Sequence, residues 1–151
     1  MINSGRVAES LRWVAQLMDA AEACGDPDLL IVGHYAAVSG YIQLGNLIKT
    51  REHADRMLVL YREERQAHLA GILNHDPKTM TLIFLARSTW MLGYPEQAVR
   101  ITGAAHNHAR QVGHPFDLGW ALTAGPLVFD FLRVAVSKRP IEWVATTACP
   151  S

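Results

Sequence analysis

The chain consists of helix-length stretches in which apolar residues recur every three or four positions, separated by short turns. This spacing is typical of amphipathic helices. The turns carry stop and start signals: Gly25 and Gly113 end a stretch, and Asp26-Pro27 and Asp76-Pro77 begin the next one. The pattern predicts six helices, over residues 7–24, 27–44, 47–73, 77–92, 95–112 and 115–133.

Two of these predicted helices depart from the simple amphipathic pattern. The second, over 27–44, is apolar nearly all round, as expected for a helix that lies between two others. The third contains the run Arg62-Glu63-Glu64-Arg65, where it can bend or break. No stretch alternates strictly between apolar and polar residues, so no strand is predicted.

The turn signals recur at regular intervals. Gly25 and Gly113 lie 88 residues apart with Asp76-Pro77 between them, which makes the mean repeat 44 residues. The inner turns at Gly45 and Gly93 lie 48 residues apart. Stacked helical hairpins require two such interleaved series of turns, whereas a four-helix bundle does not. The sequence therefore predicts an all-α fold made of about three helical hairpins.

The domain organisation follows from the extent of this pattern. A chain of 151 residues is long enough for one domain with its own core. We predict a helical repeat domain over 1–134. The pattern is lost at Ser137-Lys138-Arg139-Pro140, so 135–151 is predicted to be an irregular C-terminal tail, and we assign it no function.

Composition and charge exclude several classes of partner. The 14 basic and 14 acidic side chains cancel, and no basic patch indicates nucleic-acid binding. No window approaches the roughly 20 apolar residues that a membrane span needs. The N-terminus lacks the pattern of a secretory signal, which predicts a cytoplasmic protein. Cys24 and Cys149 do not form a Cys-x-x-Cys motif, so neither a metal knuckle nor a redox pair is expected.

One hairpin, from Leu82 to Pro115, has small and large residues at specific positions. Leu85-Ala86 form a large and small pair, Gly93 lies in the turn, and Ala98 and Ala105 are small residues of the second helix. In these positions the hairpin resembles the tetratricopeptide repeat family. The resemblance implies a right-handed α-α superhelix, that is, a tetratricopeptide-like solenoid, which binds a protein or peptide in its groove.

A closer resemblance covers roughly Val7 to Arg133. The segment from Asp76 to Ala98 resembles the C-terminal helical repeats of large bacterial signalling regulators that carry an AAA-type ATPase domain together with a cyclase or DNA-binding domain. Gly25-Asp26-Pro27 resembles the start of the preceding repeat, whereas Ala37-Val38 and Thr50 depart from the repeat pattern. The sequence has no G-x-x-x-x-G-K-S/T loop, so ATPase activity is not implied. The resemblance implies a regulatory module, stand-alone or truncated.

Residues that could support chemistry do not form a motif. His106 and His108 are two apart on a predicted helix and point in opposite directions, so we expect them at the surface and predict no metal site. His34 and His53 lie in different predicted helices. No serine or cysteine nucleophile is recognisable beside a histidine, and Asp130 is expected either to pair with Arg133 or to mark the exposed side of the last helix. We therefore predict no catalytic residues, no cofactor and no enzyme activity.

In a right-handed array the first helix of each hairpin lines the concave groove. Arg87 is the only charged residue between Lys78 and Glu96, and beside Trp90 it suits capture of a peptide carboxylate or an acidic side chain. The alternative is that Arg87 extends to solvent while Trp90 packs in the core. The residues predicted to bind a partner are Tyr35, Ser39, Gln43, Ile83, Arg87, Trp90 and Met91.

These observations predict a non-catalytic protein–protein interaction scaffold. The first alternative is a self-associating module that forms a homodimer, because a short array without polar caps exposes apolar ends. The second is a sensor of a small ligand, with a pocket under Trp90 or Trp120.

Overall fold

The computed structural model describes the backbone of residues 4–133, and within this range all regular structure is helical. Side chains are described from Gly5 to Ala124, except those of Ala8 and Gln66. The prediction of an all-α fold is confirmed for this part of the chain. The α-helices are α1 (Ser4–Cys24), α2 (Pro27–Gln43), α3 (Leu47–Leu60), α4 (Gln66–Leu73), α5 (Pro77–Met91), α6 (Pro95–Val112) and α7 (Pro115–Arg133).

The predicted tail and the predicted pairing of Asp130 both fall outside this description. Residues 135–151 lie beyond the described backbone, and Asp130 and Arg133 lie beyond the described side chains.

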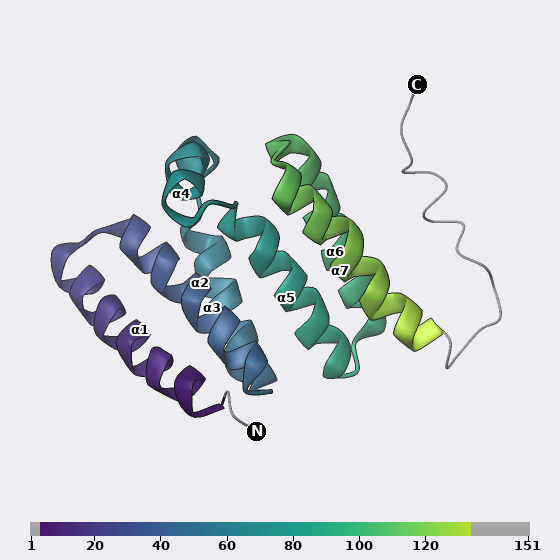
Figure 1. Cartoon of the computed structure of the whole chain (residues 1–151), viewed down its shortest axis with the longest axis horizontal. Coiled ribbons are helices and arrows are strands. Elements are labelled where there is room, and N and C mark those ends of the chain that lie inside the picture. Colours follow the sequence, from purple (N-terminus) through teal and green to yellow (C-terminus); the bar gives the residue numbers. More distant parts are fainter. Residues whose placement is uncertain (1–3, 134–151) are drawn as a thin grey trace.

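The predicted third helix is divided in two by a break at the charged run. α3 ends at Leu60, Tyr61 is extended, and a 3₁₀ turn over Glu63–Arg65 leads into α4. Side-chain bonds stabilise the break, because Tyr61 donates to Asp76 and Arg65 pairs with Asp28 at the start of α2. α4 thereby lies across the end of the α2–α3 hairpin instead of extending α3 (Figure 1).

The Asp-Pro signals begin helices as predicted. The carboxylate of Asp26 accepts hydrogen bonds from the backbone N–H groups of Asp28 and Leu29, and the carboxylate of Asp76 accepts one from Thr79. These bonds satisfy amide groups that have no partner within the helix. Proline follows at the first helical position in both cases, where its missing N–H costs nothing.

Two turns of the fold are copies of each other. In Leu44–Asn46 and in Leu92–Tyr94, three successive N–H groups donate to carbonyl oxygens four, three and five residues earlier. The central glycines, Gly45 and Gly93, have φ angles of 74° and 89°, a conformation that strongly favours glycine. The hairpins α2–α3 and α5–α6 therefore turn in the same way.

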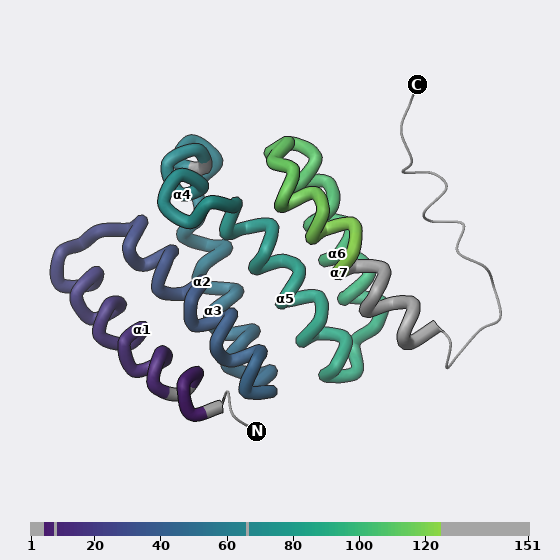
Figure 2. Tube along the Cα trace, in the orientation of Figure 1, coloured from purple at the N-terminus to yellow at the C-terminus, as the bar shows by residue number. Residues whose placement is uncertain are grey.

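The helices lie side by side in a row (Figures 1 and 2). The first helices of successive hairpins pack on one another, α2 on α5 and α5 on α7. Each also packs on the second helix of the preceding pair, α5 on α3 and α7 on α6. Helix α5 lies at the centre of this arrangement, and ten of its fifteen residues are buried.

Three apolar clusters hold the row together. One joins α5, α6 and α7 around Met80, Ile83 and Ala109, and another joins α2, α3 and α5 around Val38, Ala54 and Leu85. The third brings Leu69 of α4 onto α2 and α3. Ala98 and Ala105 of α6 are buried, as small residues at a close helix contact should be.

Helix α1 docks on α2 through two glycines. A Cβ atom placed on Gly33 would lie 2.6 Å from Met18 Cγ, and one placed on Gly40 would lie 2.7 Å from Leu11 Cδ2. Leu11 and Met18 are seven residues apart and so lie on the same face of α1. The absence of side chains at the two glycines allows this face to approach the backbone of α2.

We predict that Gly33→Ala weakens the docking of α1. Alanine in place of a mid-helix glycine normally stabilises by up to about 1 kcal/mol, but at Gly33 the added methyl overlaps Met18, and overpacking costs about 1–3 kcal/mol. Gly103→Ala is the matched control, because a Cβ there meets nothing within 4 Å. Urea unfolding should show Gly103→Ala stabilised and Gly33→Ala not; equal stabilisation would contradict the close contact.

Candidate functional site

The structure places the predicted partner-binding residues on two adjacent helices, α2 and α5. On α2, Tyr35 and Ser39 are half-buried and Gln43 is exposed. The Tyr35 hydroxyl is hydrogen bonded to Nε2 of His75 at 2.6 Å, and its ring packs against the α5–α6–α7 cluster. Gln43 bonds back to the carbonyl oxygen of Ser39, so it is engaged within its own helix.

On α5 the predicted residues divide into accessible and inaccessible ones. Arg87 and Met91 are exposed, Met91 to 56 %, and Trp90 is half-buried. Ile83 is only 7 % exposed and belongs to the apolar cluster with α6 and α7. Ile83 therefore contributes to the core. Contrary to the prediction from the sequence, it is not available to a partner.

The accessible side of α5 is narrow. In the C-terminal half of α5 it consists of the exposed Arg87 and Met91 and the half-buried Phe84 and Trp90, which together we call the α5 strip. Arg87 makes no hydrogen bond or ion pair with any other described residue. A guanidinium that is free in this way, on a helix otherwise surrounded by protein, retains all its donors for a carboxylate.

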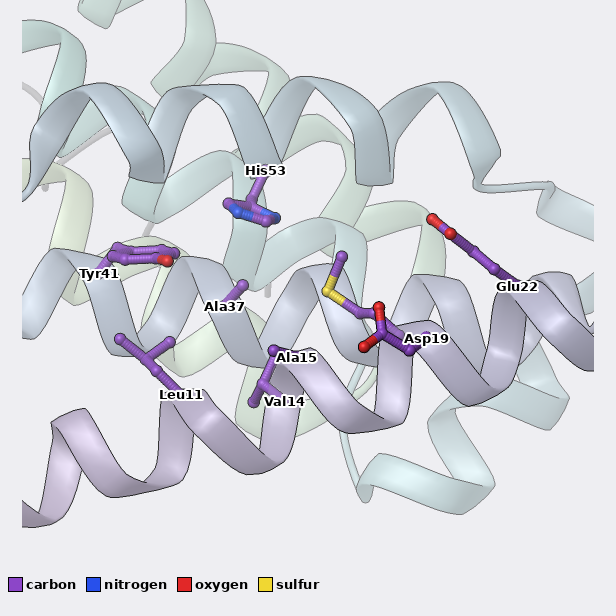
Figure 3. A pocket seen from close by; sticks show the side chains of 9 residues that line it. Leu11, Val14, Ala15, Asp19, Glu22, Ala37, Tyr41 and His53 are labelled. Atoms are coloured by element: carbon purple, nitrogen blue, oxygen red, sulfur yellow. The ribbon is translucent and has the colours of Figure 1, made fainter.

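A pocket of about 160 Å³ lies at the opposite end of the row, between α1 and the α2–α3 hairpin (Figure 3). Leu11, Val14, Ala15 and Met18 of α1 form its apolar side, and Ala37 and Tyr41 of α2 form its floor. Asp19 and Glu22 lie at one end, and the imidazole of His53 points in from α3 (Figure 3). The sequence suggested a pocket under Trp90 or Trp120, but neither residue lines this pocket.

His53 is held in the pocket by a second histidine. Its Nδ1 lies 2.9 Å from Nδ1 of His34, and its ring stacks on Tyr41 with the centroids 5.4 Å apart. A hydrogen bond between two Nδ1 atoms requires one of them to be unprotonated. Burial, the neighbouring His53 and Arg56 lower the pKa of His34 to about 4, and burial and Arg56 also lower the pKa of His53. Both rings are therefore neutral at pH 7.

A buried polar network joins α3, α5, α6 and α7 around Asp76. Asp76 is fully buried; its Oδ1 accepts from the Tyr61 hydroxyl at 2.7 Å and its Oδ2 from Nε2 of His108 at 3.0 Å. The Asp76 N–H donates to Oδ2 of Asp117, which is also fully buried. The Thr79 N–H and hydroxyl complete the set of donors to Asp76.

The two buried carboxyl groups have opposite pKa shifts. Burial alone would raise the pKa of Asp76, but the hydrogen bonds from His108, Tyr61 and Thr79 outweigh it and lower the pKa. For Asp117, burial and the charge of Asp76 outweigh the single backbone bond and raise the pKa. Burial and the bond to Asp76 also raise the pKa of the Tyr61 hydroxyl.

The expectation that His106 and His108 lie at the surface is wrong, because both side chains are buried. They are 7 % and 4 % exposed, because α6 is covered by α5 on one side and by α7 on another. His108 bonds to Asp76 and its ring meets that of Tyr61 edge-on, while burial lowers the pKa of His106. Among the residues whose side chains the structure describes, no group of three or more His, Cys, Asp or Glu could hold a metal ion.

Sequence reasoning missed the pairing of these groups for a physical reason. Asp76 is recognisable as a helix cap from Asp76-Pro77 alone, but its partner His108 is 32 residues away. The same holds for His34 and His53, which are 19 residues apart. The sequence did carry one signal of burial, namely polar residues at helix positions whose neighbours three and four residues away are apolar. Such positions become buried only when a second helix covers them, and the pattern does not say which helix does so.

Comparisons with known proteins give no independent assignment. No family model matches the sequence, and neither the curated proteins nor the solved structures contain a matching chain. Among the described residues, none of the helices has the length and apolar character to cross a membrane.

We predict that Tyr61→Phe destabilises the fold by about 1–3 kcal/mol, because it removes a buried hydroxyl and leaves Asp76 Oδ1 without this donor. Tyr94→Phe is the control, since Tyr94 is 55 % exposed and its loss should change stability by no more than about 0.5 kcal/mol. Urea unfolding monitored by circular dichroism measures both. Equal stabilities would show that the Asp76 network contributes little.

We also predict that stability falls with pH below neutrality. Between the unfolded pKa of 6.5 and the folded pKa of about 4, the unfolded chain binds a proton at His34 and the folded chain does not. The free energy of unfolding should therefore decrease from pH 7 to pH 4.5, by up to about 1.4 kcal/mol per pH unit for each such group. Thermal unfolding across this range should give a shallower slope for His34→Gln than for the unmodified chain, and equal slopes would contradict the prediction.

Proposed function

We propose that the protein is a non-catalytic scaffold that binds a protein or peptide partner on the α5 strip. The observation that carries this proposal is Arg87, which is exposed on a helix with ten of its fifteen residues buried and makes no ion pair with another described residue. Phe84, Trp90 and Met91 place apolar area beside the guanidinium. Arginine and aromatic residues of this kind dominate the binding energy of many interfaces.

We further propose that the hairpins form a right-handed, tetratricopeptide-like solenoid. The identical turns at Gly45 and Gly93 and the packing of α2 on α5 and of α5 on α7 support it. In such an array the first helices of the hairpins face the partner, and the α5 strip belongs to one of them. An acidic peptide segment, or a C-terminal carboxylate, is the partner chemistry that a free arginine fits.

The buried network around Asp76 supports a non-catalytic role for these groups. Its three central side chains, those of Asp76, His108 and Tyr61, have exposures of 0 %, 4 % and 6 %. A substrate would have to separate α5 from α6 to reach them. Their mutual hydrogen bonds instead connect the helices that position the α5 strip.

Self-association is the second candidate function. Trp13 on α1 is 66 % exposed, and Val59 on α3 is 71 % exposed. Large exposed apolar side chains favour association with another protein surface, including the surface of a second copy of this chain. Sedimentation at increasing concentration distinguishes the two candidates, because a scaffold that acts as a monomer stays monomeric.

The α5 strip can be tested with matched arginine variants. A partner recovered with the unmodified chain should bind Arg87→Ala at least about 10-fold more weakly, because an anchoring arginine contributes about 2 kcal/mol or more. Arg100→Ala on α6, an equally exposed arginine outside the strip, should bind normally. Titration calorimetry gives both affinities and circular dichroism verifies the fold. If both variants bind as well as the unmodified chain, the partner site lies elsewhere.

A further inference from the structure

The pocket between α1 and α2–α3 results from how these helices touch. Leu11 contacts Gly40 and Met18 contacts Gly33, so the interface is filled at two points one heptad apart. Between these points the chain carries alanine on both sides, at Ala15 and Ala37, and both residues line the pocket. Small side chains between two tight contacts leave a space of about 160 Å³. A cavity of about 150 Å³ with apolar walls is large enough to bind benzene.

The pocket is apolar on its walls and acidic at one end. Asp19 and Glu22 line it from α1, and both are exposed. Neither makes an ion pair or hydrogen bond with another described residue. Figure 3 shows both carboxylates on the same side of the pocket, away from Tyr41 and Leu11. The pocket therefore offers negative charge at one end and hydrocarbon at the other.

Its aromatic members add no opposing charge. The His53 ring is neutral at pH 7, and only its Nδ1 is engaged, by His34. The faces of Tyr41 and His53 stack on each other, which fixes the orientation of both rings. Nε2 of His53 is not part of this bond: it is an acceptor in the tautomer whose Nδ1 donates to His34, and a donor in the other tautomer.

We propose that this pocket binds a small apolar molecule that carries a protonated amino group. The hydrocarbon part lies against Val14, Ala15 and Ala37, and the ammonium group lies between the carboxylates of Asp19 and Glu22. Charge complementarity selects a cation over a neutral molecule or an anion of the same shape, since a carboxylate ligand would be repelled at the rim. This site is separate from the α5 strip and does not depend on the proposed scaffold function.

A series of three compounds of matched shape tests the proposal: phenethylamine, phenethyl alcohol and hydrocinnamate. In two-dimensional amide NMR titrations of the full chain at pH 7, we expect phenethylamine to shift resonances of α1, α2 and His53. It should bind about three- to ten-fold more tightly than the alcohol, and hydrocinnamate should bind least. Equal affinity for the three compounds, shifts confined to other helices, or no binding of the amine at about 10 mM would overturn the proposal.

Variants separate the charge from the cavity. The double variant Asp19→Asn with Glu22→Gln should lose the preference for the amine over the alcohol, while the amine and the alcohol both still bind. Ala15→Leu fills the pocket from an exposed position of α1 and should weaken binding of both compounds. Asp55→Asn, an exposed acid of α3 outside the pocket, is the control and should change neither. An unchanged preference in the Asp19 and Glu22 variant would contradict the assigned role of the carboxylates.

Discussion

The buried carboxylate of Asp76 is the point on which the arrangement of the helices depends. It caps α5, accepts hydrogen bonds from Tyr61 at the end of α3 and from His108 on α6, and its backbone N–H donates to Asp117 on α7. Burying a charge is costly unless hydrogen bonds replace its hydration, and here several donors do so. Because these donors come from separate helices, the network fixes how the two hairpins and α7 stand relative to one another.

The central position of α5 follows from this constraint. The start of the helix is anchored at Asp76 and its sides pack on α2, α3, α6 and α7, so Arg87 and Met91 are the only exposed side chains among its fifteen residues. Arg87 is thereby presented on a helix that packs against four others.

Helix α1 is attached to the α2–α3 hairpin by a different means. Hydrogen bonds join the start of α5 to its neighbours, whereas α1 packs on α2 at Gly33 and Gly40. Ala15 and Ala37 lie between these two contacts, and their small side chains leave a pocket. His34 and His53 support one wall of it as a neutral pair. The two interfaces therefore differ in physical character. The one around the start of α5 is filled by a hydrogen-bonded polar network, and the one between α1 and α2 retains space beside Asp19 and Glu22, which pair with no other described residue.

The sequence alone determined the positions of the helices, because Asp caps, Pro starts and Gly turns act through hydrogen bonds between residues at most five apart. It also indicated the break after α3. Only the tertiary structure decided which faces are covered: it buried Ile83, His106 and His108, and it paired His34 with His53. Those outcomes depend on how separate helices are placed against each other, and the local pattern along one helix does not contain that placement.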